Sequence, residues 1–163
     1  MRLADYTDYT LRVLMYCATH PERLVTIAEL AAEYRVSKNH LMKIVNDLAT
    51  QGLLETVRGR GGGLRLLRRA EHIRVGDVVR AAETDFRLVE CFDAARDTCT
   101  LSPSCRLKGL LGQAMQAYFD ALDGATLAEI ATPLPKSQRS ARVAPVALPP
   151  SRRGAARAAG ATR

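Results

Sequence analysis

Three cysteines are the residues of this chain whose type and spacing could do chemistry. Cys91, Cys99 and Cys105 lie within one stretch of fifteen residues, CFDAARDTCTLSPSC, separated by seven and five residues. Thiolates are soft ligands that suit iron–sulfur clusters, Zn²⁺ or Cu(I). Because a polar loop that folds back on itself can bring three thiols to one centre, this stretch indicates a metal or redox site.

Several chemistries compete for these thiols. Structural zinc sites usually take their cysteines from close Cys-x-x-Cys pairs, and neither interval here has that length. A disulfide with one spare thiol, a thiol-based redox switch and three unrelated thiols also fit the pattern. An iron–sulfur cluster is the leading hypothesis, although such a cluster normally takes four ligands.

A helix-turn-helix is the clearest fold signal among the elements that must position these thiols. Thr26 and Glu29 form a capping box that opens a short helix through about Glu33. Ser37 then caps a longer helix that Gly52 ends. One face of the longer helix is apolar, at Leu41, Ile44, Val45 and Leu48.

The second helix of this motif is predicted to be a recognition helix. Its polar side chains can read base edges and hold phosphates, whereas the alternative is an ordinary solvated face. The residues predicted to project away from the apolar stripe are Lys38, Asn39, His40, Met42, Lys43 and Asn46. Of these, Lys38, Asn39, His40 and Lys43 are the candidate DNA contacts.

Residues 53–69, LLETVRGRGGGLRLLRR, are predicted to form a basic hairpin. Four glycines, Gly59, Gly61, Gly62 and Gly63, allow its turn. A basic hairpin directly after a recognition helix is typical of a wing, with Arg58, Arg60 and Arg65 as candidate phosphate contacts. The GRGGG motif is no nucleotide-binding loop, because no Lys-Ser/Thr pair follows and no helix opens there.

The remaining helices are predicted from apolar periodicity. Residues 5–19 form a first helix in which Cys17 is a core residue, and residues 73–84 form another before the cysteine loop. Ser102 and Pro103 are expected to start a long helix that runs to about Gly124. Its apolar positions are Leu107, Leu110, Leu111, Ala114, Met115, Tyr118 and Leu122.

This long stripe exceeds the needs of a small winged helix, so we expect a dimerisation helix. An intramolecular core helix is the alternative. Thr126 and Glu129 repeat the capping box and predict a last short helix.

The net charge of +7 is concentrated at the carboxy-terminal end. Residues 133–163 carry seven Lys or Arg and no acid, which leaves 17 bases and 17 acids before them. This segment also holds five of the seven prolines, so a disordered basic tail is expected. It either adds nonspecific attraction to DNA or is a solvated appendage.

The amino terminus, MRLADYTDYTLR, is polar, and no apolar run approaches the ~20 residues of a membrane span. A cytoplasmic protein without membrane contact is therefore expected. Its reducing compartment favours thiolate ligation over structural disulfides. An enzyme is not expected, because His20, His40 and His72 are scattered and form no catalytic arrangement with Ser or Asp.

The chain resembles the IscR/NsrR family of iron–sulfur winged-helix repressors. The motifs that carry the resemblance are MRL with an Asp-Tyr pair, VSKNHLMKIVNDL, VRGRGGGLRL and the three cysteines before a long helix. They occur in the family's order between residues 1 and about 132, and they are nearer to the branch that senses nitric oxide and controls nitrosative-stress genes. The carboxy-terminal segment has no counterpart.

The resemblance implies a homodimer that binds double-stranded operator DNA and holds an iron–sulfur cluster. The expected cluster type is 4Fe–4S, and 2Fe–2S is the alternative. Cys91, Cys99 and Cys105 would be cluster ligands. In one branch a histidine three residues after the last cysteine is the fourth, but Lys108 stands there. In the other branch the fourth ligand is an aspartate of the partner's first helix, which matches Asp8. The alternative fourth ligands in this sequence are Asp5, Asp93, Asp97 and His72.

The expected fold is mostly α: a winged helix-turn-helix with a two-stranded wing, a cysteine-rich cluster loop and a long dimerisation helix. Its expected regions are residues 1–70 for DNA binding, 71–132 for the cluster and dimerisation, and 133–163 for the tail. The alternative function is an iron–sulfur or thiol-redox transcriptional regulator of cluster assembly or oxidative stress.

Overall fold

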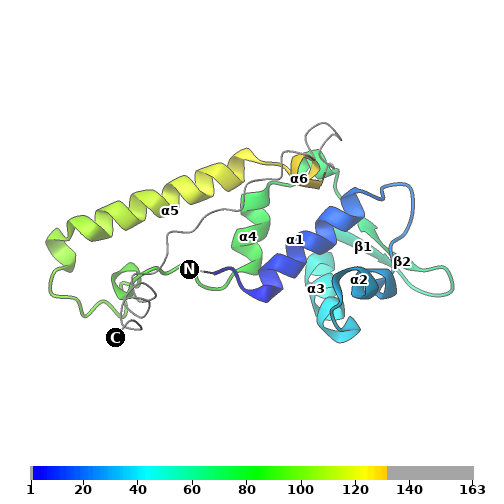
Figure 1. The fold of residues 1–163 in the computed structure, drawn as a ribbon, viewed down its shortest axis with the longest axis horizontal. Helices are drawn as coiled ribbons and strands as arrows, with labels where there is room; N and C mark the ends of the chain where they lie inside the picture. The colour runs from blue at the N-terminus through cyan, green and yellow to red at the C-terminus, as the bar shows by residue number, and fades with distance from the viewer. Residues whose placement is uncertain (1, 132–163) are drawn as a thin grey trace, which may run out of the picture. The chain divides into compact units, whose positions relative to one another are not determined.

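The computed structural model describes residues 2–131, which belong to one compact unit, Met1–Thr132. The predicted tail, residues 133–163, lies outside the described residues. Figure 1 shows the helices and the two strands. In chain order they are α1 (Asp5–Ala18), α2 (Ile27–Tyr34), α3 (Lys38–Thr50), β1 (Leu54–Val57), β2 (Gly63–Leu66), α4 (Val75–Ala82), α5 (Arg106–Gly124) and α6 (Leu127–Ala131).

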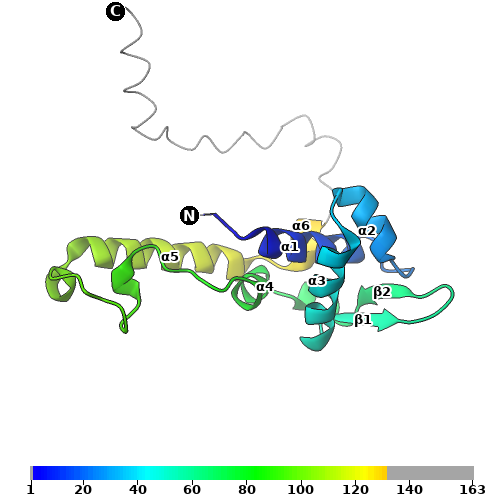
Figure 2. The same cartoon turned by 90° about the horizontal axis from the view of Figure 1, so that it is seen from below.

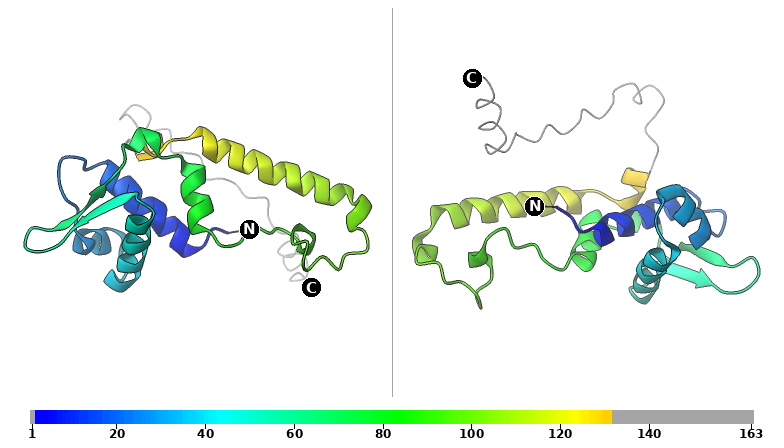
Figure 3. Two further views of the ribbon diagram at one scale, coloured as in Figure 1. Left: turned by 180° about the vertical axis from the view of Figure 1, so that it is seen from behind. Right: turned by 60° about the horizontal axis from the view of Figure 1, so that its bottom comes forward.

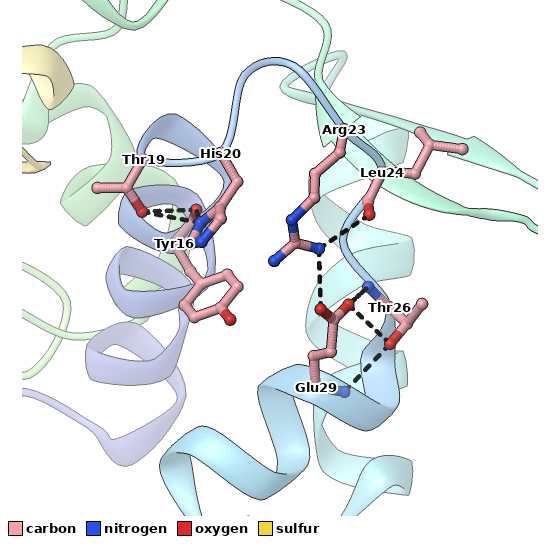
Figure 4. Close-up of polar contacts among 7 residues, drawn as sticks. All are labelled: Tyr16, Thr19, His20, Arg23, Leu24, Thr26 and Glu29. Carbon is pink, nitrogen blue, oxygen red and sulfur yellow. Dashed lines mark hydrogen bonds and ion pairs between the residues drawn. The ribbon is translucent and has the colours of Figure 1, made fainter.

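The caps of the helix-turn-helix are those predicted. The Thr26 hydroxyl accepts the Glu29 amide at 3.1 Å, and the Glu29 carboxylate accepts the Thr26 amide at 2.7 Å, as Figure 4 shows. Arg23 donates to the same carboxylate at 2.8 Å. Ser37 caps α3 by accepting the His40 amide at 3.3 Å. These contacts satisfy amide groups that the first turns of α2 and α3 leave without an intrahelical acceptor.

The hydrophobic core lies where α1, α3, the strands, α4 and α6 meet. The predicted stripe of α3 is buried in full, and Cys17 is a core residue with 2% of its surface exposed. The other large buried side chains include Leu14, Leu30, Leu54, Leu64 and Leu127. The last of these belongs to α6, so α6 helps to close the core of the DNA-binding region.

The wing is an antiparallel hairpin in which Leu54 pairs with Leu66 and Val57 with Gly63 (Figure 2). Gly59 and Gly61 have φ angles of 98° and 77°, a region that glycine adopts without steric cost. Gly63 serves another purpose, since a Cβ there would lie 2.6 Å from the Val25 carbonyl oxygen. Val25 and Leu64 exchange backbone hydrogen bonds and so tie the wing to the segment before α2.

The long helix starts later than predicted. Ser102 and Pro103 do not open it: residues Ser102–Ser104 form a 3₁₀ turn, and Cys105 is the N-cap of α5. In this turn the Ser102 hydroxyl donates to the Asp97 carboxylate five residues earlier in the loop, instead of capping α5. The predicted end at Gly124 is confirmed.

Helix α5 buries none of its residues within the chain. Leu107 and Leu110 are 58% and 62% exposed. It packs against α4, which packs in turn against α1 (Figure 1). The alternative of an intramolecular core helix is therefore wrong for this chain by itself.

Candidate DNA interface and metal centre

The cysteine loop joins α4 to the amino-terminal end of α5, the end that is remote from α6 (Figure 3). Cys91, Cys99 and Cys105 are all free and partly buried. The Cys105 sulfur accepts the Lys108 amide at 3.4 Å. Since a helix amino terminus carries partial positive charge, it favours a negatively charged ligand sulfur at this position.

These thiols are not gathered around one point in the single chain. Among residues 2–131, no group of three or more His, Cys, Asp or Glu side chains is spaced to hold a metal ion. The donor set nevertheless has the right chemistry for a soft metal centre: three free thiols on one loop, one of them at a helix amino terminus. The three therefore need the loop to close before they can ligate together.

Asp97 organises the middle of this loop, a role that the sequence pattern alone did not reveal. Its carboxylate accepts the Cys99 amide at 3.1 Å, the Ser102 hydroxyl, and the Lys108 ammonium at 3.5 Å. These contacts, the Ser102 hydrogen bond first, hold the pKa of Asp97 below its ordinary value. Lys108, which stands where one branch of the family has a histidine, also donates to Ser102 at 2.8 Å. An Asp two residues before a Cys was the only available signal, since Asp side chains commonly accept the amide two residues on.

Asp8 lies in the first turn of α1, with its side chain 46% exposed. It forms an ion pair with Arg12 at 2.8 Å. The Arg12 guanidinium in turn lies 5.4 Å from the ring centre of Tyr9. Within the described residues of this one chain, Asp8 does not join the loop thiols in a metal-binding group.

The exposed face of α3 carries Lys38, Asn39 and Lys43, as predicted from the helical period. Met42, 44% exposed, is an apolar residue on this face. A lysine, an amide and a thioether offer phosphate, base-edge and thymine-methyl contacts respectively.

His40 does not project from this face, contrary to the prediction. Its ring packs edge-on against Tyr6 and Tyr9 of α1, with ring centres 6.4 and 5.5 Å apart. The His40 Nε2 is buried and has no hydrogen-bond partner among the described residues. The position lies one residue before the stripe residue Leu41 and four before Ile44, so the tyrosines of α1 can draw the ring inward.

The wing presents two of its three candidate arginines without a carboxylate partner. Arg58 and Arg60 are exposed, and neither forms an ion pair with any residue from 2 to 131. Arg65 instead pairs at 2.7 Å with Glu55, its partner across the hairpin. Arg58 and Arg60 at the wing tip are therefore more available than Arg65 to contact DNA phosphates.

No helix in the described part of the chain is long and apolar enough to cross a membrane.

A capped helix-turn-helix followed by a basic two-stranded wing defines a winged-helix regulator. This chain adds a loop with three free thiols and a long helix to that fold.

The chain belongs to the Rrf2 family, described as iron-dependent transcriptional regulators, whose profile matches residues 3–133. It is 50% identical over 131 residues to the HTH-type transcriptional regulator NsrR of Bacillus licheniformis, covering 80% of this chain and 92% of that protein. It is 49% identical over 131 residues to the NsrR of Bacillus subtilis, covering 80% and 90%. The resemblance to this family is therefore confirmed.

Among solved structures, the oxidized form of CymR from Staphylococcus aureus is similar, with a TM-score of 0.67 and 26% identity over 83% of this chain and 100% of that chain. The predicted mostly α-helical winged-helix fold is confirmed. The chain is a helix-turn-helix transcriptional regulator and, like these relatives, no enzyme.

Proposed function

We propose that this regulator is a homodimeric repressor that binds operator DNA and senses nitric oxide through an iron–sulfur cluster. In this proposal Cys91, Cys99 and Cys105 hold the cluster, with Asp8 of the partner subunit as the fourth ligand. The observation that carries the proposal is the set of three free thiols on one loop, in a chain 50% identical to a regulator named NsrR.

The uncovered face of α5 supports dimerisation. Leu107 and Leu110 are more than half exposed, although they belong to an apolar stripe that continues through Leu111 and Tyr118. Burying a leucine removes about 1.5–3 kcal/mol of unfavourable hydration. A second copy of α5 would cover the same stripe on both chains, as a twofold interface requires.

The donor set supports a cluster with one ligand of a different kind. When bound, the cluster supplies the chemistry with nitric oxide, and the thiolates anchor it. Asp8 would bring a harder oxygen ligand with lower affinity for iron than sulfur has. Its present partner is Arg12, in an exposed pair four residues along the helix, and such pairs contribute only about 0.3–0.5 kcal/mol. Asp8 can therefore exchange Arg12 for another partner at low cost.

Contacts between α1 and α3 support a route from Asp8 to the DNA. Tyr6 donates its hydroxyl to Asp47 of α3, and burial, followed by this hydrogen bond, raises the pKa of Tyr6 to about 12. Tyr9, next to Asp8, packs against His40 of α3. A shift of α1 when Asp8 changes partner would thus act on both ends of the recognition helix.

In the DNA complex, Asn39 would read base edges, and Lys38 and Lys43 would hold phosphates. The wing would add Arg58 and Arg60, with Arg65 available once it leaves Glu55. His40 would contribute by holding α3 against α1. Residues 1–70 are thus proposed to bind DNA, and residues 71–132 to carry the cluster and the dimer contact.

Anaerobic purification tests the proposal. The protein should be brown, contain iron and acid-labile sulfide, and bind a selected operator until nitric oxide is added. Each of the substitutions Cys91→Ser, Cys99→Ser and Cys105→Ser should remove the colour and the operator binding, whereas Cys17→Ser should remove neither. A colourless protein with full operator affinity would contradict the proposal.

Mixed dimers test whether the fourth ligand crosses the subunit boundary. One chain carries Asp8→Ala, and the other lacks all three loop cysteines. The only thiol-bearing loop then faces an intact Asp8 of the partner subunit, so one cluster of normal stability per dimer is expected. A cluster as labile as that of the Asp8→Ala homodimer would instead place Asp8 within its own chain.

A thiol-redox regulator is the second candidate, favoured by free thiols that are not gathered for metal binding in the single chain. The same preparation separates the two. A redox regulator would lack iron and would lose operator affinity on mild oxidation, with a disulfide between two loop cysteines visible by mass spectrometry.

A further inference from the structure

Helices α4 and α5 approach each other closely at Gly76 of α4 and Asp123 of α5. A Cβ on Gly76 would lie 1.8 Å from Oδ1 of Asp123 and 3.1 Å from its backbone nitrogen. A larger residue at position 76 would therefore displace the Asp123 carboxylate from its present place and crowd the α5 backbone. The contact lies near the carboxy-terminal end of α5, where this helix returns to the DNA-binding region.

One turn along α4, Arg80 reaches the same aspartate. Its guanidinium donates to Asp123 Oδ1 at 2.6 Å and lies 5.0 Å from the ring centre of Phe119, one turn before Asp123 on α5. Phe119 packs edge-on against Phe86, with ring centres 4.9 Å apart. Arg80 also contacts Asp77 at 3.2 Å, but that residue belongs to α4 itself. Of these two carboxylates, Asp123 is the one that joins the helices.

Backbone hydrogen bonds fix the same junction from the other side. The Val75 amide donates to the Ala125 carbonyl at 3.0 Å, and the Leu127 amide donates to the Ile73 carbonyl at 2.8 Å. Together with the Arg80–Asp123 ion pair, they hold the end of α5 at two places about one and a half turns of α4 apart. The other end of α5 contacts the cysteine loop instead, through Lys108 with Asp97 and Ser102.

We infer that the Arg80–Asp123 contact across Gly76 is a clamp that sets the angle between α5 and the recognition helix, and with it the half-site spacing that the dimer accepts. Arg80 and Asp123 are positioning residues in this inference. It rests on the proposed function, because it requires a dimer joined through α5. In such a dimer, rotation at this junction moves both recognition helices relative to each other.

Half-site spacing is a sensitive measure of that angle. Inserting one base pair between two half-sites moves them apart by about 3.4 Å and rotates one against the other by about 34°. A dimer with a rigid junction should reject this change, whereas a dimer with a loosened junction should follow it.

The experiment uses the anaerobically purified holo dimer and measures affinity for synthetic duplexes. A twofold-symmetric operator is first selected from a randomised pool with the wild-type protein, and its centre is then lengthened or shortened by one base pair. The wild type should lose at least about tenfold in affinity for each change, the size of effect that one wrong base pair has. Asp123→Asn should reduce that loss to about threefold or less.

Asp77→Asn is the matched control, since it removes a carboxylate that also touches Arg80 but does not bridge to α5. It should discriminate between spacings as the wild type does. A purely structural defect lowers the affinity for all duplexes by one factor, so the ratio between duplexes is the decisive quantity. Arg80→Gln removes the other partner of the Arg80–Asp123 ion pair. Its discrimination between spacings tests the clamp if Asp123→Asn does not fold.

Equal discrimination by Asp123→Asn, Arg80→Gln and the wild type would overturn the clamp while leaving the proposed repressor intact. Relaxed discrimination in Asp77→Asn as well would also overturn it, because the effect would then not depend on the bridge. If the wild type bound no symmetric duplex, the proposed function and the clamp would fall together.

Discussion

At the scale of single residues, this protein uses cysteine in two different ways. Cys17 is 2% exposed within the core, and burial raises the pKa of its thiol to about 12. The three loop cysteines are partly exposed on a polar segment. Because only a thiolate attacks or ligates, Cys17 is chemically silent near neutral pH, and the loop thiols are available.

Thiol labelling should therefore separate the two groups. In the metal-free, reduced and folded protein at pH 8, a maleimide reagent should modify Cys91, Cys99 and Cys105, while Cys17 stays unmodified until the chain is unfolded. With a pKa about four units above the pH, only about one Cys17 thiol in ten thousand is ionised. Mass spectrometry of the digested protein measures the sites. Labelling of Cys17 at the rate of the loop thiols would contradict its burial.

The DNA face allows base contacts to be separated from phosphate contacts. Asn39→Ala should cost about 1–3 kcal/mol at one base position and relax the preference there, whereas Arg60→Ala should weaken binding to every sequence and lower the salt slope by about one. Binding to single-base operator variants at several salt concentrations measures both effects.

His40→Ala serves as the comparison, because the ring packs against α1. It should lower thermal stability and affinity for all sequences, without relaxing the preference at any one base. If it changed base preference and left stability unaltered, the inward placement of His40 would be wrong.

At the scale of elements, α5 exposes large apolar side chains to solvent in the single chain. No residue of α5 is fully buried, and Leu107 and Leu110 of its apolar stripe are more than half exposed. The local sequence is sufficient to form the helix, since Leu, Ala, Gln and Met are good helix formers. Only a second surface can remove the stripe from water.

Leu110→Lys should therefore weaken dimerisation by about 10- to 100-fold, the loss expected when a buried leucine is replaced by a charge. Gln116→Lys is the matched control on the far side of α5, where the new lysine can pair with Asp120 four residues on. Analytical ultracentrifugation measures the dimer, and circular dichroism verifies that both chains remain helical. Equal dimerisation of the two variants would place the interface elsewhere.

At the scale of the whole molecule, the charge is divided along the chain. The first 132 residues carry equal numbers of acidic and basic side chains, and the net charge of +7 arises after them. The compact unit Met1–Thr132 contains the helix-turn-helix, the wing, the cysteine loop and α5. Folding and specific binding are therefore expected to reside in this unit.

A chain that ends at Thr132 should keep the melting temperature and the absorption spectrum of the full chain. Its affinity for nonspecific DNA should fall, with a salt slope lower by up to about six, since seven positive charges are removed. An unchanged slope would show that residues 133–163 are a solvated appendage. Loss of the fold or of the cluster would show that this segment has a structural role.

The elements that were predicted well are those specified by neighbours in the chain. Thr26 finds Glu29 three residues on, and Ser37 finds the amide of His40, so the starts of α2 and α3 follow from local hydrogen bonds. The buried stripe of α3 follows from the helical period in the same way. The family motifs could be recognised for the same reason, because each is a short pattern of neighbouring residues. Their fixed order along the chain predicted the winged-helix fold.

Two predictions failed where a side-chain contact that the helical period does not encode decides the local structure. Asp97 takes the Ser102 hydroxyl, so α5 begins at Arg106 with Cys105 as its cap. Tyr6 and Tyr9, more than thirty positions earlier, draw the His40 ring off the DNA face.

The sequence alone determined the capped helices, the basic wing and the cysteine-rich loop between two helices, because each is specified by residues close together in the chain. Only the tertiary structure decided where His40 points and how closely Gly76 of α4 approaches Asp123. These features depend on contacts between elements that meet after folding, and no local period or cap encodes the energy of such contacts.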